Sequence, residues 1–254
     1  SDLILVSNDD GITTEGIKSL AKAMSSCGDV YVVAPHVQRS ASSHALSVSG
    51  EITLREVEFE GAKKAYECDG TPADCVKLGI DMLKQEGVII DVVYAGINHG
   101  GNLGTDTMYS GTVSAAAEGM MAGLPAVAVS VNSHEASHFE GACKLAVQTL
   151  PLAMSFGRKG VISINTPDIP AEEIKGVKVC KLGAVEYDQW FEEISRSGDS
   201  KTYRYRGTPS ELDHWTEDMD VRLIRQGYAT ISAIRYDLND YEGLKEIKGW
   251  ELKI

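Results

Sequence analysis

The fold is decided near the start of the chain by the stretch LILVSNDDG, residues 3–11. An apolar run of one strand's length is followed at once by a polar turn that holds two adjacent carboxylates, Asp9 and Asp10. After this turn, Thr14 is a plausible N-cap of a helix whose apolar residues recur at helical spacing as far as Met24. The stretch therefore predicts the first strand, turn and helix of a β-α-β unit.

The same alternation continues along the next 150 residues. Further strands are expected at residues 30–33, 91–95, 125–131 and 161–164, further helices at 72–83, 112–121 and 141–154, and an extended segment at 52–59. Pro72 suits a first helical turn, and Asp74 is interpreted as a residue that compensates the dipole of that helix. Repeated β-α-β order predicts an α/β fold with a mainly parallel sheet and helices on both faces.

The C-terminal third departs from this rhythm. Residues 185–220 carry two tryptophans and many charges, and the alternation Tyr203-Arg204-Tyr205-Arg206 suits a two-faced hairpin. A returning strand is expected at 228–234. We interpret the segment as an excursion from a single domain, residues 1–254, and not as a second core.

Composition excludes several classes of protein. The 254 residues include 24 Lys and Arg against 37 Asp and Glu, a formal charge of −13, so binding of duplex nucleic acid through a basic face is not expected. No apolar stretch is long enough for a membrane span, and no basic leader precedes the first strand. The five cysteines are scattered and never form CxxC, which indicates neither a disulfide framework nor a zinc site. The expected location is the cytoplasm.

Polar residues follow several of the predicted strands. These are Asp9 and Asp10 after the first, Ser40 after the second, Asn98 after residues 91–95 and Asn165 after residues 161–164. Ligands of open parallel sheets bind at the carboxyl ends of the strands, so these side chains are expected to converge on one rim. Adjacent carboxylates favour a hard cation between them, and oxygen donors of these types suit Mg²⁺ or Mn²⁺.

The helix expected at 112–121 follows a glycine-rich stretch and opens with Ser110, Gly111 and Thr112. Unpaired backbone N–H groups and the helix dipole at such a terminus favour a phosphate. The chain has no P-loop motif, no GxGxxG after the first strand and no GxSxG, which argues against the corresponding nucleotide, dinucleotide and serine-hydrolase sites.

Each motif also has a structural interpretation when it is taken singly. An isolated DDG is usually a turn, and a glycine-rich loop is usually a connection. The histidines near the rim, His36, His44 and His99, are each interpreted as solvated loop residues. The combination of motifs therefore carries more weight than any one of them.

Several motifs in order resemble the SurE family of metal-dependent nucleoside monophosphate phosphatases, over nearly the whole chain. The matching segments are VSNDDG at 6–11, AP at 34–35, Ser40, GTPADCV at 70–76, GINHGGNLG at 96–104, YSGTV at 109–113, SINTP at 163–167, GY at 227–228 and IS at 231–232. The chain departs from the family at Ala41, where glycine is usual, and at 218–219 and 232–234.

The resemblance implies a Rossmann-like three-layer fold with a C-terminal arm. It implies one divalent ion per subunit, Mg²⁺ or Mn²⁺, held by Asp9, Asp10, Ser40 and Asn98. It implies a phosphate site formed by Asn8, Ser110, Gly111 and Thr112. It also implies a homodimer or homotetramer built through an exchanged arm, for which residues 185–226 are the candidate.

The expected reaction is hydrolysis of nucleoside 5′-monophosphates, and of 3′-monophosphates, to nucleoside and phosphate. The ion would neutralise phosphoryl oxygens and activate a water molecule, and Asp9, Asp10 or a second metal-bound water would accept its proton. Some family members also act on short polyphosphate. The alternative is a regulatory module that binds a nucleotide at the same rim without turnover.

Overall fold

The computed structural model describes residues 1–37, 50–157, 160–183, 186–187, 191–205, 209–210 and 216–253. Ser40, Ala41, His44 and the two tryptophans of the C-terminal excursion lie outside the described residues.

The described residues form one sheet of nine strands in the order β3-β4-β2-β1-β5-β6-β7-β13-β8. The six central strands run parallel: β4 (Ala62–Cys68), β2 (Gly28–Pro35), β1 (Asp2–Ser7), β5 (Val92–His99), β6 (Ala126–Val131) and β7 (Val161–Thr166). The outer strands are β3 (Leu54–Glu56), antiparallel to β4, then β13 (Ala229–Ile234), antiparallel to β7, and β8 (Val177–Val179), parallel to β13. The predicted mainly parallel α/β sheet is therefore confirmed.

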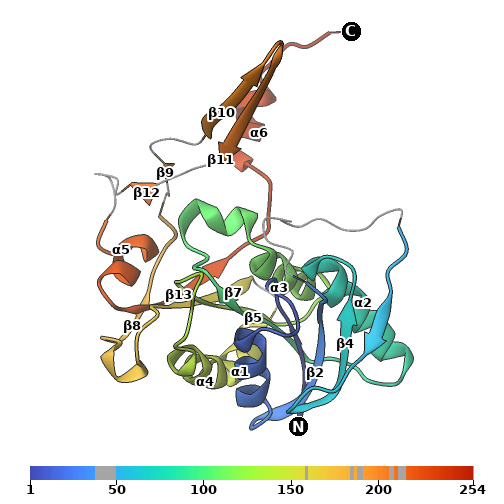
Figure 1. Cartoon of the computed structure of the whole chain (residues 1–254). Helices are drawn as coiled ribbons and strands as arrows, with labels where there is room; N and C mark the ends of the chain where they lie inside the picture. Colours follow the sequence, from blue (N-terminus) through green and yellow to red (C-terminus); the bar gives the residue numbers. More distant parts are fainter. Residues whose placement is uncertain are drawn as a thin grey trace.

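Two pairs of helices cover the two faces of this sheet (Figure 1). One face packs against α1 (Glu15–Met24) and α4 (Glu140–Phe156). The other packs against α2 (Pro72–Gln85) and α3 (Gly111–Met121). The three layers bury two apolar cores, one on each side of the central strands.

Local chemistry sets where the helices begin. Thr71 caps α2 by accepting the Asp74 N–H, while the Asp74 carboxylate accepts the Thr71 N–H, so the two residues form a capping box. Thr14 occupies the N-cap position of α1 as predicted, but its hydroxyl makes no cap bond and instead donates to the Gly11 carbonyl at 2.8 Å. The start of α1 is thereby tied to the turn that carries Asp9.

Helix α3 lies close to the sheet because its buried face consists of small residues. Ala115, Ala116 and Ala117 are fully buried, and a Cβ atom on Gly119 would lie 2.6 Å from Val93 Cγ2 of β5. The approach of α3 to β5 thus depends on the absence of a side chain at position 119.

Several described elements were not predicted from the sequence. They include β4, the short helices α5 (Asp220–Arg225) and α6 (Tyr241–Ile247), and the 3-10 helices η1 (Gly104–Tyr109) and η2 (Ala171–Glu173). The predicted hairpin is present as β10 (Phe191–Ser197) and β11 (Ser200–Tyr205), an antiparallel pair that projects away from the body (Figure 1). The strands β9 (Glu186–Tyr187) and β12 (Pro209–Ser210) pair near its base. Among the described helices, none has the length and apolar character needed to cross a membrane.

Replacing Gly119 with Ala is expected to destabilise the protein by about 1–2 kcal/mol, because overpacking against β5 outweighs the gain in helix propensity. Urea unfolding followed by circular dichroism measures the change. Met121→Ala on the same helix is the control, since the Met121 side chain is half exposed, and it should shift stability by less than about 0.5 kcal/mol. Equal or greater stability of Gly119→Ala would contradict this account of the packing.

Candidate functional site

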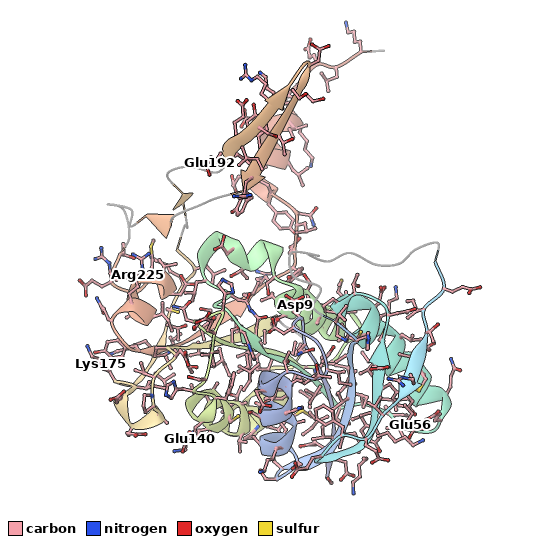
Figure 2. All side chains as sticks on the ribbon, viewed as in Figure 1. Asp9, Glu56, Glu140, Lys175, Glu192 and Arg225 are labelled. Carbon is pink, nitrogen blue, oxygen red and sulfur yellow. The ribbon has the colours of Figure 1, made fainter. Side chains whose placement is uncertain are left out.

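Asp9 is a buried carboxylate that lies against the start of α3. It follows β1 directly and is only 7% exposed, and its Oδ1 has no hydrogen-bond partner among the described residues. A Cβ atom on Gly111 would lie 2.5 Å from this oxygen, so a side chain there would collide with the carboxylate. The structure therefore brings together the two sites predicted separately, the acidic turn and the glycine at the helix terminus. Figure 2 labels Asp9 in the body of the molecule.

Burial, and then the neighbouring charge of Asp10, raise the pKa of Asp9 from 3.8 to about 6. A buried carboxylate without a partner is costly to ionise, and a cation bound to it would remove much of that cost. The unpartnered Oδ1 is thus an observation of this structure that fits a metal ligand.

Asp10 is held from the end of β5. Its Oδ2 accepts the backbone N–H of His99 at 2.8 Å. The ring of His99 in turn accepts the Gly16 N–H at its Nε2, 3.2 Å away, and packs on Phe139 with ring centroids 5.2 Å apart. The interpretation of His99 as a solvated loop residue was wrong, because this ring is wedged between the start of α1 and α4.

The two asparagines of the predicted site have different roles in the structure. Asn8 is fully buried, and its amide donates to the Gly11 carbonyl at 2.8 Å and to Thr14 Oγ1 at 3.1 Å. It therefore shapes the acidic turn, and its predicted contact with phosphate stays a prediction. Asn98, the penultimate residue of β5, donates from Nδ2 to the Gly100 carbonyl at 2.7 Å. That bond fixes the amide next to His99, and hence close to Asp10.

The start of α3 presents a helix terminus with polar side chains around it. Ser110 caps the helix by accepting the Val113 N–H at 3.0 Å. The hydroxyls of Thr112 and of Ser7, at the end of β1, are buried and have no hydrogen-bond partner among the described residues. Two unpartnered hydroxyls and the first-turn N–H groups of a helix form a set of donors suited to a phosphate. We call Ser110, Gly111 and Thr112 the phosphate seat.

Asn165 lies at the carboxyl end of β7, as its position after a predicted strand suggested, but its side chain binds the glycine-rich loop. Its Oδ1 accepts the Asn102 N–H at 2.9 Å, and its Nδ2 donates to the Asn102 carbonyl at 3.3 Å. Asn102 also donates to Ser130 Oγ at 2.5 Å and accepts from the Thr107 hydroxyl at 3.2 Å. This buried network supports the glycine-rich loop from below and leaves Asn165 with a structural role.

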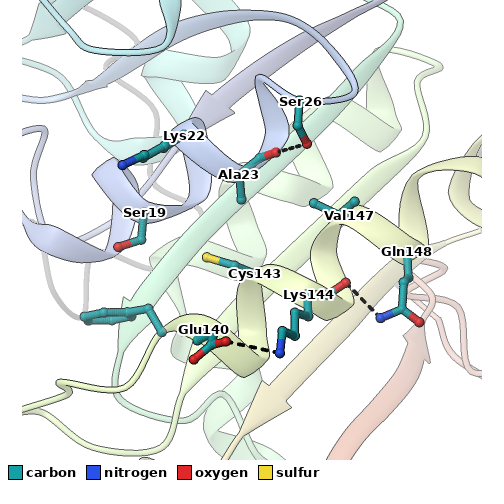
Figure 3. A pocket seen from close by; sticks show the side chains of 10 residues that line it. Ser19, Lys22, Ala23, Ser26, Glu140, Cys143, Lys144, Val147 and Gln148 are labelled. Atoms are coloured by element: carbon teal, nitrogen blue, oxygen red, sulfur yellow. Dashed lines mark hydrogen bonds and ion pairs between the residues drawn. The ribbon is translucent and has the colours of Figure 1, made fainter. Parts of the chain in front are cut away.

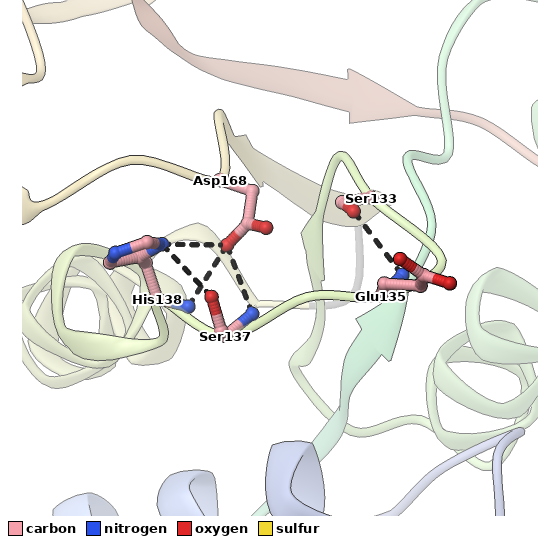
Figure 4. A network of polar contacts seen from close by, with 5 residues as sticks. All are labelled: Ser133, Glu135, Ser137, His138 and Asp168. Carbon is pink, nitrogen blue, oxygen red and sulfur yellow. Dashed lines mark hydrogen bonds and ion pairs between the residues drawn. The ribbon is translucent and has the colours of Figure 1, made fainter.

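The loop between β6 and α4, residues 132–139, lies next to Asn98. Its His134 ring lies 3.1 Å from the position of a Cβ atom on Gly100. Asp168 anchors the same loop, since its Oδ1 accepts the N–H groups of Ser137 and His138 at 3.0 and 2.9 Å and contacts His138 Nδ1 at 3.1 Å (Figure 4). Burial opposes ionisation of Asp168, but these bonds outweigh it and lower its pKa.

The donor set for a metal combines two carboxylates with neutral oxygens. No group of three or more His, Cys, Asp or Glu side chains that could hold an ion occurs in the parts of the chain that the structure describes. The described candidates for metal ligands are the carboxylates of Asp9 and Asp10 and the side-chain amide oxygen of Asn98. The fourth predicted ligand, the hydroxyl of Ser40, lies outside the described residues. Hard oxygen donors of this kind suit Mg²⁺ or Mn²⁺ better than zinc.

A groove on the body lies away from this site. It has a volume of about 850 Å³ and runs between α1 and α4, lined by Ala23, Phe139, Cys143, Val147 and polar neighbours (Figure 3). None of the predicted site residues lines it.

Asp9→Asn is expected to stabilise the metal-free protein above pH 6. An unfolded aspartate ionises near 3.8, whereas Asp9 in the folded state ionises near 6. The folded state therefore binds more protons between these values, and the wild-type free energy of unfolding falls as the pH rises through this window. In chelator at pH 7.5 the variant should be more stable by about 1–3 kcal/mol, and the difference should vanish near pH 4.

Urea unfolding at the two pH values measures the effect, with Asp29→Asn as the control because the Asp29 side chain is 40% exposed. A variant less stable than wild type at pH 7.5 would show that Asp9 has a stabilising partner in the folded protein.

Comparisons with known proteins show which family the chain is similar to. The model of the family "Survival protein SurE" matches residues 4–189. A protein of Clostridium botulinum strain Alaska E43 named "5'-nucleotidase SurE" is 39% identical over 251 residues, 96% of this chain and 98% of its own length. One of Synechococcus elongatus with the same name is 38% identical over 256 residues, 96% of this chain and 97% of its own length.

The fold is also found in a solved structure. The crystal structure of the SurE protein from Aquifex aeolicus has a TM-score of 0.82 and 34% identity, covering 97% of this chain and 98% of that chain. With matched sequence over most of its length and the same fold, the chain belongs to the SurE family.

Proposed function

We propose that this protein is a metal-dependent nucleotidase that hydrolyses nucleoside 5′-monophosphates, and 3′-monophosphates, to nucleoside and phosphate. The observation that carries the proposal is the unpartnered Oδ1 of Asp9 held against Gly111 at the start of α3. Carboxylates alone would repel a phosphate from this position, so the seat functions only if a cation lies with them. The relatives named 5'-nucleotidase SurE support the same reaction class.

The proposed ion ligands are Asp9, Asp10, Ser40 and Asn98, with Mg²⁺ or Mn²⁺ as the ion. When bound, a divalent ion would neutralise charge on the phosphoryl oxygens and lower the pKa of a water molecule. The protein supplies the positions of these oxygens. The His99 backbone fixes Asp10, and Asn8 fixes the turn that carries Asp9.

The phosphate seat supplies hydrogen-bond donors for the transferred group. In this proposal the N–H groups of Gly111 and Thr112 and the Thr112 hydroxyl, which is buried without a partner among the described residues, donate to the terminal oxygens of a monoester, and the positive end of the α3 dipole adds to the attraction. Because phosphoryl transfer has a loose transition state, placement and charge stabilisation do most of the catalytic work, and the chain needs no nucleophilic side chain. The proton released by water passes to the Asp9–Asp10 pair.

Replacing Asp9 or Asp10 with Asn is expected to reduce kcat for nucleoside monophosphates by about 10²-fold or more, since each change removes a ligand charge and a proton acceptor. Phosphate release from a panel of 5′- and 3′-monophosphates and short polyphosphate, assayed with and without chelator, measures activity. Asp81→Asn is the control, because Asp81 lies on the exposed side of α2 and contacts Gln85.

Loss of activity in chelator and its return with Mg²⁺ or Mn²⁺ are expected in the same assay. Undiminished hydrolysis without metal would overturn the proposal. Nucleotide binding without phosphate release from any substrate would instead identify the protein as a regulatory module that senses a nucleotide.

We further propose a homodimer or homotetramer assembled through residues 185–226 and the C-terminal segment. Phe191, Tyr203 and Tyr205 of the hairpin are 52–57% exposed, and Leu238, Tyr241, Trp250 and Leu252 of the C-terminal segment are 56–92% exposed. Exposed apolar side chains gathered on projecting elements are typical of protein interfaces.

The double substitution Tyr203→Ser and Tyr205→Ser is expected to lower the molecular mass in solution by at least half, because it removes two aromatic side chains from the proposed interface. Size-exclusion chromatography with light scattering measures the mass. Arg204→Ser, which changes the intervening residue of the same strand, is the control and should leave the mass unchanged. A wild-type chain that is monomeric at micromolar concentration would contradict the proposed assembly.

A further inference from the structure

Asp220 is a buried carboxylate outside the proposed metal and phosphate sites. It is 1% exposed and begins α5, on the C-terminal side of the hairpin. Its Oδ2 accepts the Gly104 N–H at 2.8 Å, while its Oδ1 accepts the N–H groups of Gly183 and Val221, each at 2.8 Å. The two oxygens of one side chain therefore hold different parts of the chain.

The Oδ1 side of Asp220 faces the base of the hairpin, residues 181–183 and 218–221. Here the two ends of the excursion pair with each other: the Lys181 N–H donates to the Asp218 carbonyl at 3.1 Å, and the Asp220 N–H donates to the Lys181 carbonyl at 3.0 Å. Figure 1 shows α5 on the body below the hairpin. Asp220 thus fixes the position from which the hairpin leaves the body.

The Oδ2 side of Asp220 holds the segment that leads to the phosphate seat. Gly104 is the first residue of η1, and this single 3-10 segment ends at the residue before Ser110. The Ser110 N–H donates to the Thr107 carbonyl at 3.2 Å, so the end of η1 sets the start of α3. A shift of Gly104 is therefore transmitted to the phosphate seat through one short, hydrogen-bonded segment.

We propose that Asp220 is a positioning residue that couples the hairpin base to the phosphate seat, so that the placement of the hairpin sets the affinity for phosphate. The inference rests on the proposed function for its ligand, an inorganic phosphate or a phosphate monoester. The ligand does not touch Asp220, whose effect passes through Gly104 and η1.

The geometry requires a carboxylate and not an amide. Every partner of Asp220 given above is a backbone N–H donor, and only a carboxylate offers acceptors on both oxygens. An amide at this position would turn an NH₂ group toward either Gly104 or Gly183, which leaves one of the two sides without its bond. Asp220→Asn therefore uncouples the two sides with little change in volume.

The test measures phosphate affinity separately from metal affinity and from turnover. Isothermal titration calorimetry of inorganic phosphate in saturating Mg²⁺, and of Mg²⁺ alone, is carried out on the full-length wild type and on Asp220→Asn. We expect the phosphate Kd to rise about tenfold, which is the effect of one lost charge-assisted bond, with the Mg²⁺ Kd changed less than about twofold. Asp218→Asn is the matched control, since Asp218 pairs with Lys181 on the exposed side of the same base, and it should change neither constant.

A second variant approaches the coupling from the hairpin side. A Cβ atom on Gly183 would lie 2.8 Å from Val221 Cγ2 and 3.2 Å from Met219 Sδ, so Gly183→Ala displaces the base without touching η1. It should also weaken phosphate binding while leaving Mg²⁺ binding unchanged, and it serves as the test if Asp220→Asn does not fold.

The inference is overturned if either folded variant binds phosphate as tightly as wild type, or if phosphate and Mg²⁺ affinities fall together, which would indicate general loss of structure. This outcome is distinct from failure of the proposed function. If the proposed function fails, the wild type itself releases no phosphate from nucleotides, and its affinity for inorganic phosphate still reports on the coupling.

Discussion

The close approach of the end of β1 to the start of α3 is the constraint on which the proposed site depends. Asp9 can lie against the first turn of α3 only because residue 111 has no side chain, and its Oδ1 has no hydrogen-bond partner in the described parts of the chain. The surrounding structure holds this unfavourable arrangement in place. The small residues of α3 set the helix close to β5, and Asn8 and Thr14 close the turn below Asp9. A buried carboxylate oxygen without a partner lowers the stability of the fold, and unfavourable groups that the surrounding structure holds in place are typical of functional sites.

The buried polar groups around this point divide into those that have partners and those that do not. Asn102, Asn165, Ser130 and Thr107 bond to one another beneath the glycine-rich loop. In contrast, Oδ1 of Asp9 and the hydroxyls of Ser7 and Thr112 have no hydrogen-bond partner among the described residues. Since buried polar groups are nearly always hydrogen-bonded, the second set supports the ligand site proposed above.

Much of the fold could be predicted because the central strands are short apolar runs separated by helices with clear periodicity and caps. The strand β4 was missed because its first half is exposed and carries Lys63 and Lys64, which hide its apolar character. The site was predictable to the extent that the carboxyl ends of parallel strands meet at one edge. Contacts made through backbone N–H groups could not be predicted, because every residue except proline carries this group. The bonds from His99 to Asp10 and from Gly104 to Asp220 are of this kind, and so is the role of Asn165, whose amide turns to the loop and not to the rim.

The two margins of the sheet bear on how copies of this chain can associate. The edge strands of the described sheet, β3 on one side and β8 on the other, have only three residues each. Each of them carries an exposed basic residue, Arg55 in β3 and Lys178 in β8. Brief, charged margins discourage the addition of a further strand from another molecule. Growth of the central sheet into a continuous intermolecular sheet is therefore disfavoured, which leaves the elements that stand clear of it for the proposed self-association.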